Sequence, residues 1–369
     1  MNIQNVTPYQ AGWTMGFERD GHELLVVMVK ATFQIPDHPN EPPPLAPKQA
    51  KLTEADISSG EPGFSAIAYE SDYAHRKPFC DILLNGSAYA PHGDAVKELG
   101  VGLRVGRLEK VFKVIGDRHW ETGVLSTSAS SPKPFSVMPI SYDRAFGGFD
   151  NSDPKLLRLY NQNPAGKGFS YHMKRLDGSP LPNTEKIGQT VTHPGSSYQP
   201  MAFGPIGRAW EPRCQFAGTY NKEWIETRAP FWPDDFDYRH FQAAPPDQQV
   251  PYLRGGEEIT LVNLSPNGKE IVQFSLPALP MPVIFIPHQG NDHHTQAVID
   301  TLLLEPDLNR FSITWRTTMT TKRSMFDIKE IITGQMPQSW LRARRFPGKT
   351  WYRDLDELVK ARGVKRKTT

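Results

Sequence analysis

Proline and glycine are the residues that most limit what this chain can fold into. The 369 residues include 34 prolines and 29 glycines. Together they make up about a sixth of the chain, above the ~12% of average usage. Proline fixes φ and removes a backbone donor, whereas glycine supplies backbone angles that other residues avoid. With an aromatic content of 11%, this composition favours many short strands joined by ordered loops rather than disorder.

Apolar runs predict strands on both sides of a loop-rich centre. Leu24–Ile35 is a continuous run rich in β-branched residues that stops at Pro36, which is typical of a buried strand. The alternating segments Gly100–Gly106 and Lys110–Ile115 predict a hairpin with one buried face. A second hairpin is predicted around Asn267-Gly268, a dipeptide typical of tight turns. Its strands and the remaining expected strands are Ile259–Leu264, Glu270–Leu276, Phe64–Tyr69, Cys80–Tyr89, Val283–Ile286, Ala297–Leu304, Phe311–Thr318 and Phe326–Thr333.

The order of these segments predicts a mainly β fold. We expect an antiparallel, sandwich-like scaffold with a long loop-rich central region and a short C-terminal helix. The expected parts are an N-terminal β region at 1–135, the central region at 136–255, a C-terminal β region at 256–335 and a basic tail at 336–369. Residues up to about 335 are expected to form one continuous domain. The helix is predicted at Asp354–Arg362, with Asp354 as its cap.

The central region lacks long periodic segments. An unstructured insertion of that length is unusual in a compact domain unless it is functional. We therefore expect the region to be ordered and wrapped over the β scaffold. Short helical turns such as Asp153–Tyr160 are predicted within it, and the Ser- and Thr-rich stretch from Thr122 to Ser131, just before it, is predicted to be a loop.

Charge and hydropathy exclude several classes of protein. Lysine and arginine number 42 against 40 aspartates and glutamates, whereas a dedicated nucleic-acid-binding protein needs a dense basic face. No apolar run approaches the ~18 residues that a membrane helix needs. The first residues are polar, so we expect no membrane insertion and a cytoplasmic location. Cys80 and Cys214 are too few for a disulfide framework, and whether they pair stays open.

Two polar clusters are candidates for chemistry. His288, Asp292, His293 and His294 fall within seven residues of an expected loop, and zinc takes such ligands, but the helical spacing of a zinc-protease motif is absent. Carboxylates near tryptophans resemble sugar-cleaving sites, although aspartates that cap turns give the same pattern. These carboxylates are Asp143, Asp150, Asp234, Asp235, Asp237 and Glu257. We expect no metal and no cofactor.

An ordered set of motifs resembles a known bacterial family. The set begins with Asn5–Pro8, Val26–Phe33, Glu70–Asp72 and Val114–Trp120. It continues through the centre with Met138–Gly148, Asn163–Phe169, Leu181–Asn183, Ala217–Asn221, Ala244–Gln248 and Gly255–Glu257. In this order, from about Asn5 to Trp315, they resemble domain-of-unknown-function family 2169, whose members are associated with type VI secretion.

The resemblance implies an adaptor or chaperone, not an enzyme, that helps to load a toxic effector protein onto the secretion spike. An ordered loop surface loses little conformational entropy on binding, and aromatic and arginine side chains are enriched at binding hot spots. We therefore expect partner contacts at Tyr142, Arg144, Phe146, Phe169, Tyr220, Trp224 and Trp232. The alternatives are a hydrolase that acts on cell-envelope carbohydrate and a structural component of the spike.

Overall fold

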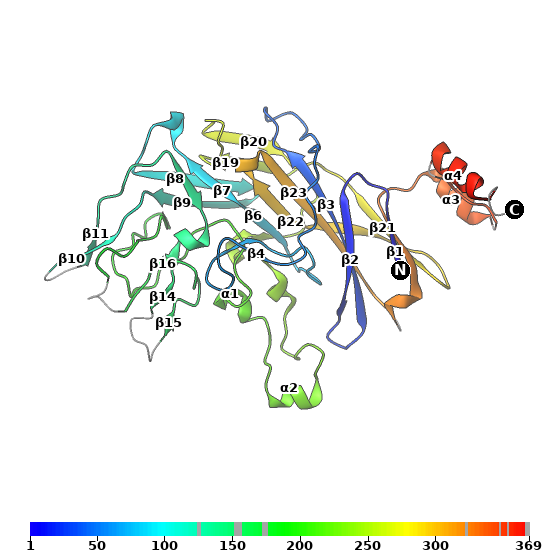
Figure 1. The fold of residues 1–369 in the computed structure, drawn as a ribbon, viewed down its shortest axis with the longest axis horizontal. Helices are drawn as coiled ribbons and strands as arrows, with labels where there is room; N and C mark the ends of the chain where they lie inside the picture. The colour runs from blue at the N-terminus through cyan, green and yellow to red at the C-terminus, as the bar shows by residue number, and fades with distance from the viewer. Residues whose placement is uncertain are drawn as a thin grey trace.

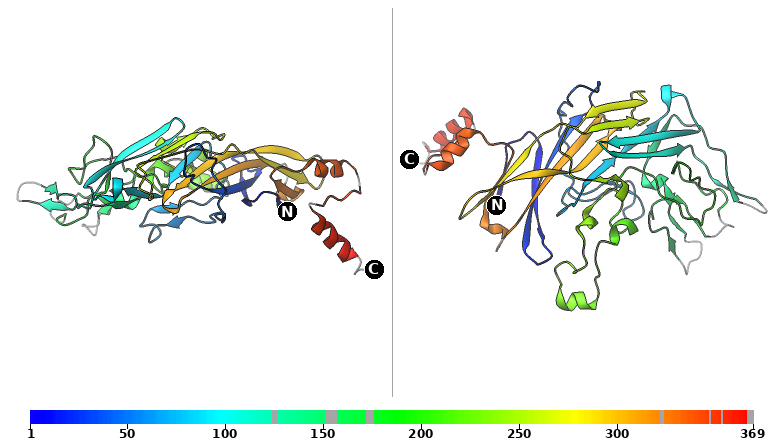
Figure 2. Two further views of the ribbon diagram at one scale, coloured as in Figure 1. Left: turned by 90° about the horizontal axis from the view of Figure 1, so that it is seen from above. Right: turned by 180° about the vertical axis from the view of Figure 1, so that it is seen from behind.

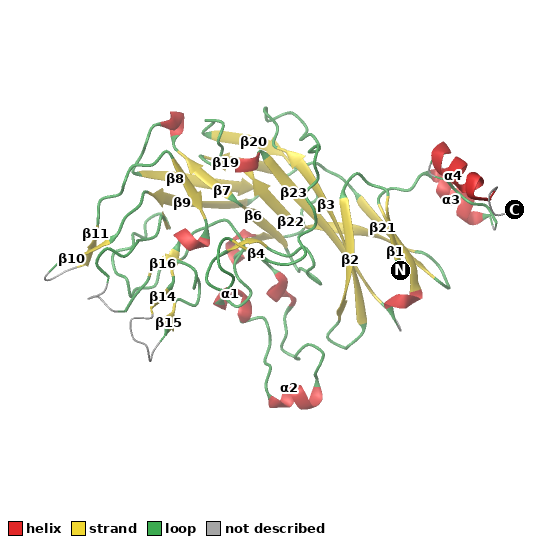
Figure 3. Ribbon diagram, viewed as in Figure 1, coloured by secondary structure: helices red, strands yellow, loops and turns green. Residues whose placement is uncertain are grey.

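The longest apolar run forms β3 (Glu23–Gln34), and every side chain from Leu24 to Phe33 is buried. This strand was predicted from the sequence and is confirmed. The computed structural model describes residues 1–123, 127–150, 157–171, 176–321, 324–346, 348–352 and 354–365. Strands dominate these ranges and the helices are short (Figure 3). Within them, no helix combines the length and the apolar character needed to cross a bilayer.

β3 belongs to a nine-stranded sheet that contains both the first strand of the chain, β1, and the last, β24. Most neighbours are antiparallel, but β1 pairs with β24 and β6 pairs with β22 in parallel, so the sheet is mixed rather than purely antiparallel. In order, the main path is β1 (Asn2–Asn5), β24 (Ile328–Thr333), β21 (Met281–Pro287), β22 (His293–Glu305), β23 (Arg310–Thr320), β3 and β2 (Gln10–Phe17). Beside β22 lie β6 (Cys80–Leu84) and then β18 (Gln249–Val250).

A second, five-stranded sheet is antiparallel and consists mainly of the two predicted hairpins, which are confirmed. Its order is β17 (Thr184–Glu185), β9 (Leu108–Ile115), β8 (Glu98–Val105), β19 (Glu258–Val262) and β20 (Ile271–Ser275). β8 pairs directly with β19, although the two strands lie on opposite sides of the central region in the sequence. The N-terminal and C-terminal β regions therefore share one sheet.

The two sheets pack face to face and enclose the main core, as expected for a sandwich (Figures 1 and 2). From the large sheet, Phe33 stacks on Phe311 at 5.4 Å between ring centroids. From the small sheet, Phe274 lies 5.1 Å from the same Phe311 ring. Full burial of each such side chain contributes about 1.5–3 kcal/mol to folding, so this core is the principal source of stability.

The end of the large sheet farthest from the small one curls, so that β1 lies beside β2. Its outer surface is covered by α3 (Gln338–Arg345), which the sequence did not predict. Trp340 of α3 is buried against Ile284, Ile286 and Ile332. The predicted C-terminal helix is present as α4 (Leu355–Lys365), and the amide of Glu357 donates to Asp354 Oδ1 at 2.8 Å, which confirms the cap.

The central region and the loops that precede it in the chain are ordered through short strand pairs rather than long elements. Two expectations for this part of the chain need correction. Thr122–Ser131 was predicted to be a loop, but part of it forms a small antiparallel strand pair. Asp153–Tyr160 was predicted to be a helical turn, but Arg158 and Leu159 form a strand. Residues 151–156 lie outside the described ranges. The pairs are β10 (Trp120–Thr122) with β11 (Thr127–Ala129), β7 (Gly86–Tyr89) with β12 (Val137–Ile140), β13 (Phe146–Gly147) with β16 (Lys167–Gly168), β14 (Phe149–Asp150) with β15 (Arg158–Leu159), and β4 (Ile57–Ser58) with β5 (Ile67–Tyr69).

Candidate functional site

A fully buried asparagine, Asn163, holds the first loops of the central region together. Its Nδ2 donates to the carbonyl oxygens of Tyr142 and Phe146, at 2.8 and 3.1 Å. Gly147 has a φ of +150°, and a Cβ at this position would lie 2.1 Å from the carbonyl oxygen of Asn163. Glycine is therefore required here, which explains one of the Gly-rich motifs in the sequence.

A second fully buried asparagine, Asn183, ties the same loops to the small sheet. Its Nδ2 donates to the carbonyl oxygen of Ile115 at 3.0 Å. Its Oδ1 accepts from Arg144 Nη1 at 3.1 Å and from Lys167 Nζ at 2.6 Å. Buried side-chain amides with several partners specify one geometry, so the loop surface is preorganised.

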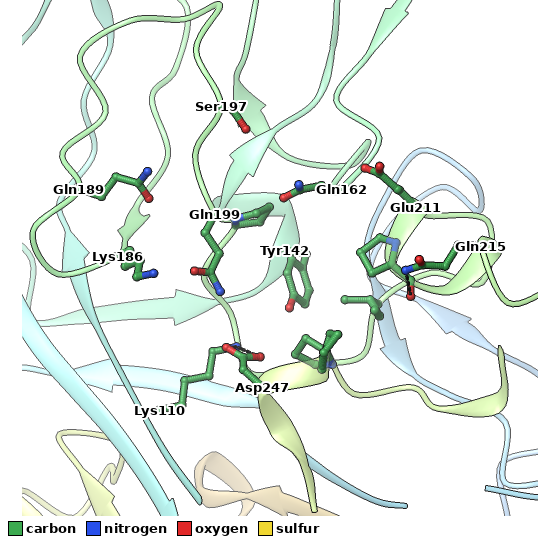
Figure 4. Close-up of a pocket in the computed structure, with 15 residues that line it drawn as sticks. Lys110, Tyr142, Gln162, Lys186, Gln189, Ser197, Gln199, Glu211, Gln215 and Asp247 are labelled. Atoms are coloured by element: carbon green, nitrogen blue, oxygen red, sulfur yellow. Dashed lines mark hydrogen bonds and ion pairs between the residues drawn. The ribbon is translucent and has the colours of Figure 1, made fainter. Parts of the chain in front are cut away.

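These loops surround a hollow of about 640 Å³, and this hollow is called the cleft from here on. This volume lies within the ~300–1,000 Å³ typical of ligand pockets. Apart from Lys110 on β9, the residues that line it all come from the central region. Its wall includes α1 (Glu211–Cys214), prolines from several loops, and the four glutamines Gln162, Gln189, Gln199 and Gln215 (Figure 4).

The floor of the cleft is a polar cluster around the buried side chain of Lys110. Its Nζ donates to Asp247 Oδ1 at 3.1 Å and to Gln248 Oε1 at 2.7 Å. Gln248 Nε2 in turn donates to the carbonyl oxygens of Ile82 and Phe203, at 2.6 and 2.9 Å. Burial lowers the pKa of Lys110, and the charge of Asp247 and its hydrogen bond to Lys110 oppose that shift. The floor is thus anchored to the core of the sandwich.

Tyr142 stands above this floor and is only 3% exposed. Its ring meets the edge of Trp210 at 5.5 Å, and its hydroxyl points into the cleft toward Asp247 (Figure 4). Burial, and to a lesser extent the charge of Asp247, raise the pKa of this hydroxyl well above its usual value. The group therefore stays protonated and acts as a neutral hydrogen-bond donor.

Residues 217–236, which follow the α1 wall of the cleft, leave the body as an arm (Figures 1 and 2). The tip carries α2 (Lys222–Thr227), and Asn221 caps this helix by accepting from the amide of Trp224 at 2.9 Å. Trp224 Nε1 donates to the carbonyl oxygen of Phe231 at 2.9 Å, which closes the tip. Two large side chains at the tip remain exposed, Tyr220 at 52% and Ile225 at 63%.

The base of the arm is fastened to the β2–β3 hairpin and to an aromatic cluster. Trp232 Nε1 donates to the carbonyl oxygen of Phe17 at 3.0 Å, and Arg228 Nη2 donates to that of Arg19 at 2.6 Å. The Trp232 ring stacks on Phe236 at 4.3 Å. The arm is therefore held in one orientation at its base while its tip projects.

Two histidines at this base predict a pH-dependent stability. The pKa values of His75 and His240 are both lowered, chiefly by burial. As pH falls, these histidines are protonated in the unfolded chain before they are protonated in the folded protein, which favours unfolding. Their contribution to the free energy of unfolding is therefore complete above the unfolded pKa of about 6.5 and is lost as pH falls toward the lower folded pKa values. We expect the melting temperature to fall between pH 7.5 and 5.5, and the double variant His75→Gln/His240→Gln to show a shallower slope. His38→Gln, at an exposed position, is the control, and an unchanged slope in the double variant would contradict the assignment.

Comparison with known proteins identifies the family. The model of a family described as "Uncharacterized protein conserved in bacteria (DUF2169)" matches residues 20–316. This chain belongs to DUF2169. No curated protein and no solved structure matches it. The match covers the small sheet, the cleft, the arm and the central strands of the large sheet, whereas β1, β2 and β24 lie outside it.

The seven residues expected to contact partners lie in two places in this DUF2169 chain. Tyr220, Trp224 and Trp232 belong to the arm. Tyr142, Arg144, Phe146 and Phe169 belong to the loops around Asn163 and Asn183. Tyr142 and Phe146 are buried and so are not the exposed anchors that we expected, because the turn-rich loops use these rings as their own core. Sequence analysis also missed Lys110 and the glutamines of the cleft, which no motif marks.

The histidine-rich segment does not assemble a metal site in the DUF2169 structure. His293 and His294 begin β22 rather than lying in a loop, so their side chains leave opposite faces of the strand. The His293 ring packs near Phe285, at 6.1 Å between centroids. His288, Asp292 and these two residues therefore do not converge. Within the described ranges no three histidine, cysteine, aspartate or glutamate side chains are grouped to bind a metal ion.

The six carboxylates of the hydrolase alternative stabilise turns and loops. None of them lines the cleft. Asp143, for example, accepts from the amide of Ala66 at 2.7 Å, and Glu257 accepts from that of Gly255 at 2.9 Å. Hydrogen bonds from Thr219 lower the pKa of Asp235, whereas a general acid of a glycosidase needs a raised pKa. Hydrogen bonds or ion pairs to nearby groups also hold Asp150, Asp234 and Asp237.

The two cysteines are not paired. Cys80 is buried in β6, whereas Cys214 is exposed at the end of α1, and both are free thiols. Burial, followed by the charges of Asp300 and Asp81, raises the pKa of the Cys80 thiol. A buried thiol with a raised pKa is a poor nucleophile, so Cys80 is a packing residue.

Proposed function

We propose that this protein is an adaptor that binds a type VI secretion effector in the cytoplasm and helps to load it onto the secretion spike. The ordered motifs that resemble the family support this function, and the family match extends across all of them except Asn5–Pro8. The arm is the structural observation that carries the proposal. It is a projecting segment, fixed at its base, whose tip exposes apolar side chains that the core of the protein does not use.

A preorganised arm suits protein recognition on energetic grounds. Association costs about 0.5–1.5 kcal/mol for each flexible side chain that becomes ordered. The capped helix α2 and the hydrogen bond from Trp224 to Phe231 already order the tip, so little of this cost remains. Exposed tyrosine and isoleucine side chains can then bury apolar area against a partner.

The cleft supplies a second place for contact next to the arm. Gln215 in the cleft wall lies two residues before the arm begins at Ala217. An adaptor that delivers a client to a spike must hold two proteins, and two adjacent binding features meet that need. We assign the arm to docking and the cleft to a more specific contact.

Substitution at the tip of the arm tests the proposal. We expect Ile225→Asp to reduce recovery of the effector and of a spike component at least tenfold, since one buried charge without a partner costs more than about 1.4 kcal/mol. Tagged protein would be purified from the native host while the secretion system is expressed, and the partners quantified by mass spectrometry. Ile271→Asp is the matched control, because Ile271 is 56% exposed on the edge strand β20, away from the arm.

Two results would contradict the adaptor function, and one would contradict the role assigned to the arm. The wild type could recover neither a toxin-like protein nor a spike component. Both aspartate variants could retain the partners equally, which would leave the arm without a role in binding. A stable homotrimer that binds tightly into the spike would instead indicate a structural component of the spike.

A further inference from the structure

The hydroxyl of Tyr142 is the feature of the cleft that the fold itself does not use. The side chain is nearly completely buried, yet its oxygen makes no hydrogen bond to any described residue. It points into the open space of the cleft (Figure 4). Because this oxygen faces the open cleft rather than the packed interior, it can donate to an acceptor atom of a bound ligand.

The other polar groups around this space are neutral overall. Two lysines, Lys110 and Lys186, are balanced by two carboxylates, Glu211 and Asp247. The amide groups of Gln162, Gln189 and Gln199 line the same space and make no side-chain hydrogen bonds to the described residues (Figure 4). Each amide offers a donor and an acceptor together. Such a lining favours an uncharged ligand with many alternating donors and acceptors.

Two ligand classes have that chemistry, polypeptide main chain and oligosaccharide. Sugar rings stack on exposed aromatic faces. Among the described residues, Tyr142 is the only aromatic side chain that lines the cleft, and its ring is buried against Trp210, so none of these residues offers an open face for stacking. Proline side chains shape the walls instead, and they supply apolar surface without adding donors. The lining therefore favours a polypeptide.

We propose that the cleft binds an extended, uncharged polypeptide segment through its main chain. The Tyr142 hydroxyl donates to a carbonyl oxygen of the segment, and the Asp247 carboxylate accepts from a neighbouring amide. The side-chain amide of Gln199 pairs with the next peptide unit in both directions. The segment belongs to the client protein, so this inference rests on the proposed adaptor function.

Peptide display tests the inference without knowledge of the client. A phage library of random 12-residue peptides would be selected on the complete wild-type protein, and the binding of selected peptides measured by fluorescence anisotropy. We expect Tyr142→Phe, which removes only the hydroxyl, to weaken binding about three- to tenfold, the range for one neutral hydrogen bond. Gln199→Ala is expected to act in the same direction. Gln273→Ala, on β20 outside the cleft, is the control and leaves binding unchanged.

Chemical modification of a selected peptide separates main-chain from side-chain recognition. N-methylation of the amide that faces Asp247 is expected to abolish binding, whereas single alanine substitutions change it less than threefold. The inference is overturned if no peptide is selected, if Tyr142→Phe binds as tightly as the wild type, or if alanine scanning alone removes binding. Binding of chitohexaose or maltoheptaose in place of peptides would overturn it in favour of a carbohydrate ligand.

The experiment also separates this inference from the proposed function. Ile225→Asp alters the arm only, so it should lose the partners in cells and still bind the selected peptides. If peptides bind but no effector or spike component is ever recovered, the cleft inference survives and the adaptor function fails. If partners are recovered equally with Tyr142→Phe and no peptide binds, the adaptor function survives and the cleft inference fails.

Discussion

Replacement of Asp81 by alanine is expected to destabilise the protein by about 3–5 kcal/mol, the cost of breaking a buried ion pair from one side. Asp81 is fully buried on β6 and accepts from Lys77 Nζ at 2.8 Å. It also accepts from Gln242 Nε2 at 2.6 Å and from the amides of Ala243 and Ala244, at 2.8 and 3.1 Å. One carboxylate therefore joins the large sheet to the central region.

The loss would leave the buried Lys77 ammonium without its counter-ion, together with three unsatisfied donors. Urea unfolding followed by tryptophan fluorescence measures the effect. If Asp81→Ala does not fold, Asp81→Asn keeps the shape, and the addition of Lys77→Met should recover part of the stability because the orphan charge is gone. Glu258→Ala, which breaks the exposed pair with Arg104, is the control and should cost less than about 1 kcal/mol. A similar cost for Asp81→Ala would refute the role assigned to it.

Replacement of Arg213 by alanine is expected to loosen the cleft wall and the arm while the sandwich stays folded. Arg213 is buried on α1 and forms a two-pronged pair with Glu70, at 2.9 and 3.2 Å. It also donates to the carbonyl oxygens of Ile206 and His240, at 2.8 and 3.0 Å. We expect the free energy of unfolding to fall by about 2–4 kcal/mol. The loss is smaller than for a buried carboxylate left without any counter-ion, because Arg208 still pairs with Glu70 at 2.9 Å.

Hydrogen exchange locates this effect. Amides of residues 206–244 should exchange faster in Arg213→Ala, whereas those of β3 and β23 should keep their protection. Arg213→Lys is expected to behave similarly, because lysine cannot reproduce the two-pronged geometry. Arg239→Ala is the control, since its pair with Asp237 is exposed. Uniform loss of protection across both sheets would contradict the local role of Arg213.

Local sequence patterns were enough to predict most of the strands. The alternation in Gly100–Gly106 and Lys110–Ile115 and the Asn267-Gly268 turn gave both hairpins of the small sheet. Asp354 gave the start of α4. These features arise from interactions between residues close in sequence, whose period or turn chemistry is visible in the residues themselves.

The candidate site could not be predicted in the same way. Aromatic residues in turn-rich loops serve as core or as surface with the same local sequence, so Tyr142 and Phe146 were expected on the surface and are buried. The partners of Asp81 and Arg213 lie 161 and 143 residues away, at Gln242 and Glu70. Spacing along the sequence carries no signal for such pairs.

The mainly β class, the two hairpins, the ordered proline-rich centre and the family resemblance could all be predicted from the residues alone, because composition and short-range periodicity specify them. Three features depend on long-range packing and have no local signal: the central loops close around a cleft, Tyr142 turns its hydroxyl into that cleft, and residues 217–236 project as an arm. Those outcomes depend on which distant side chains share the interior. They are settled by the packing of the two sheets and by buried ion pairs such as Lys77–Asp81 and Arg213–Glu70.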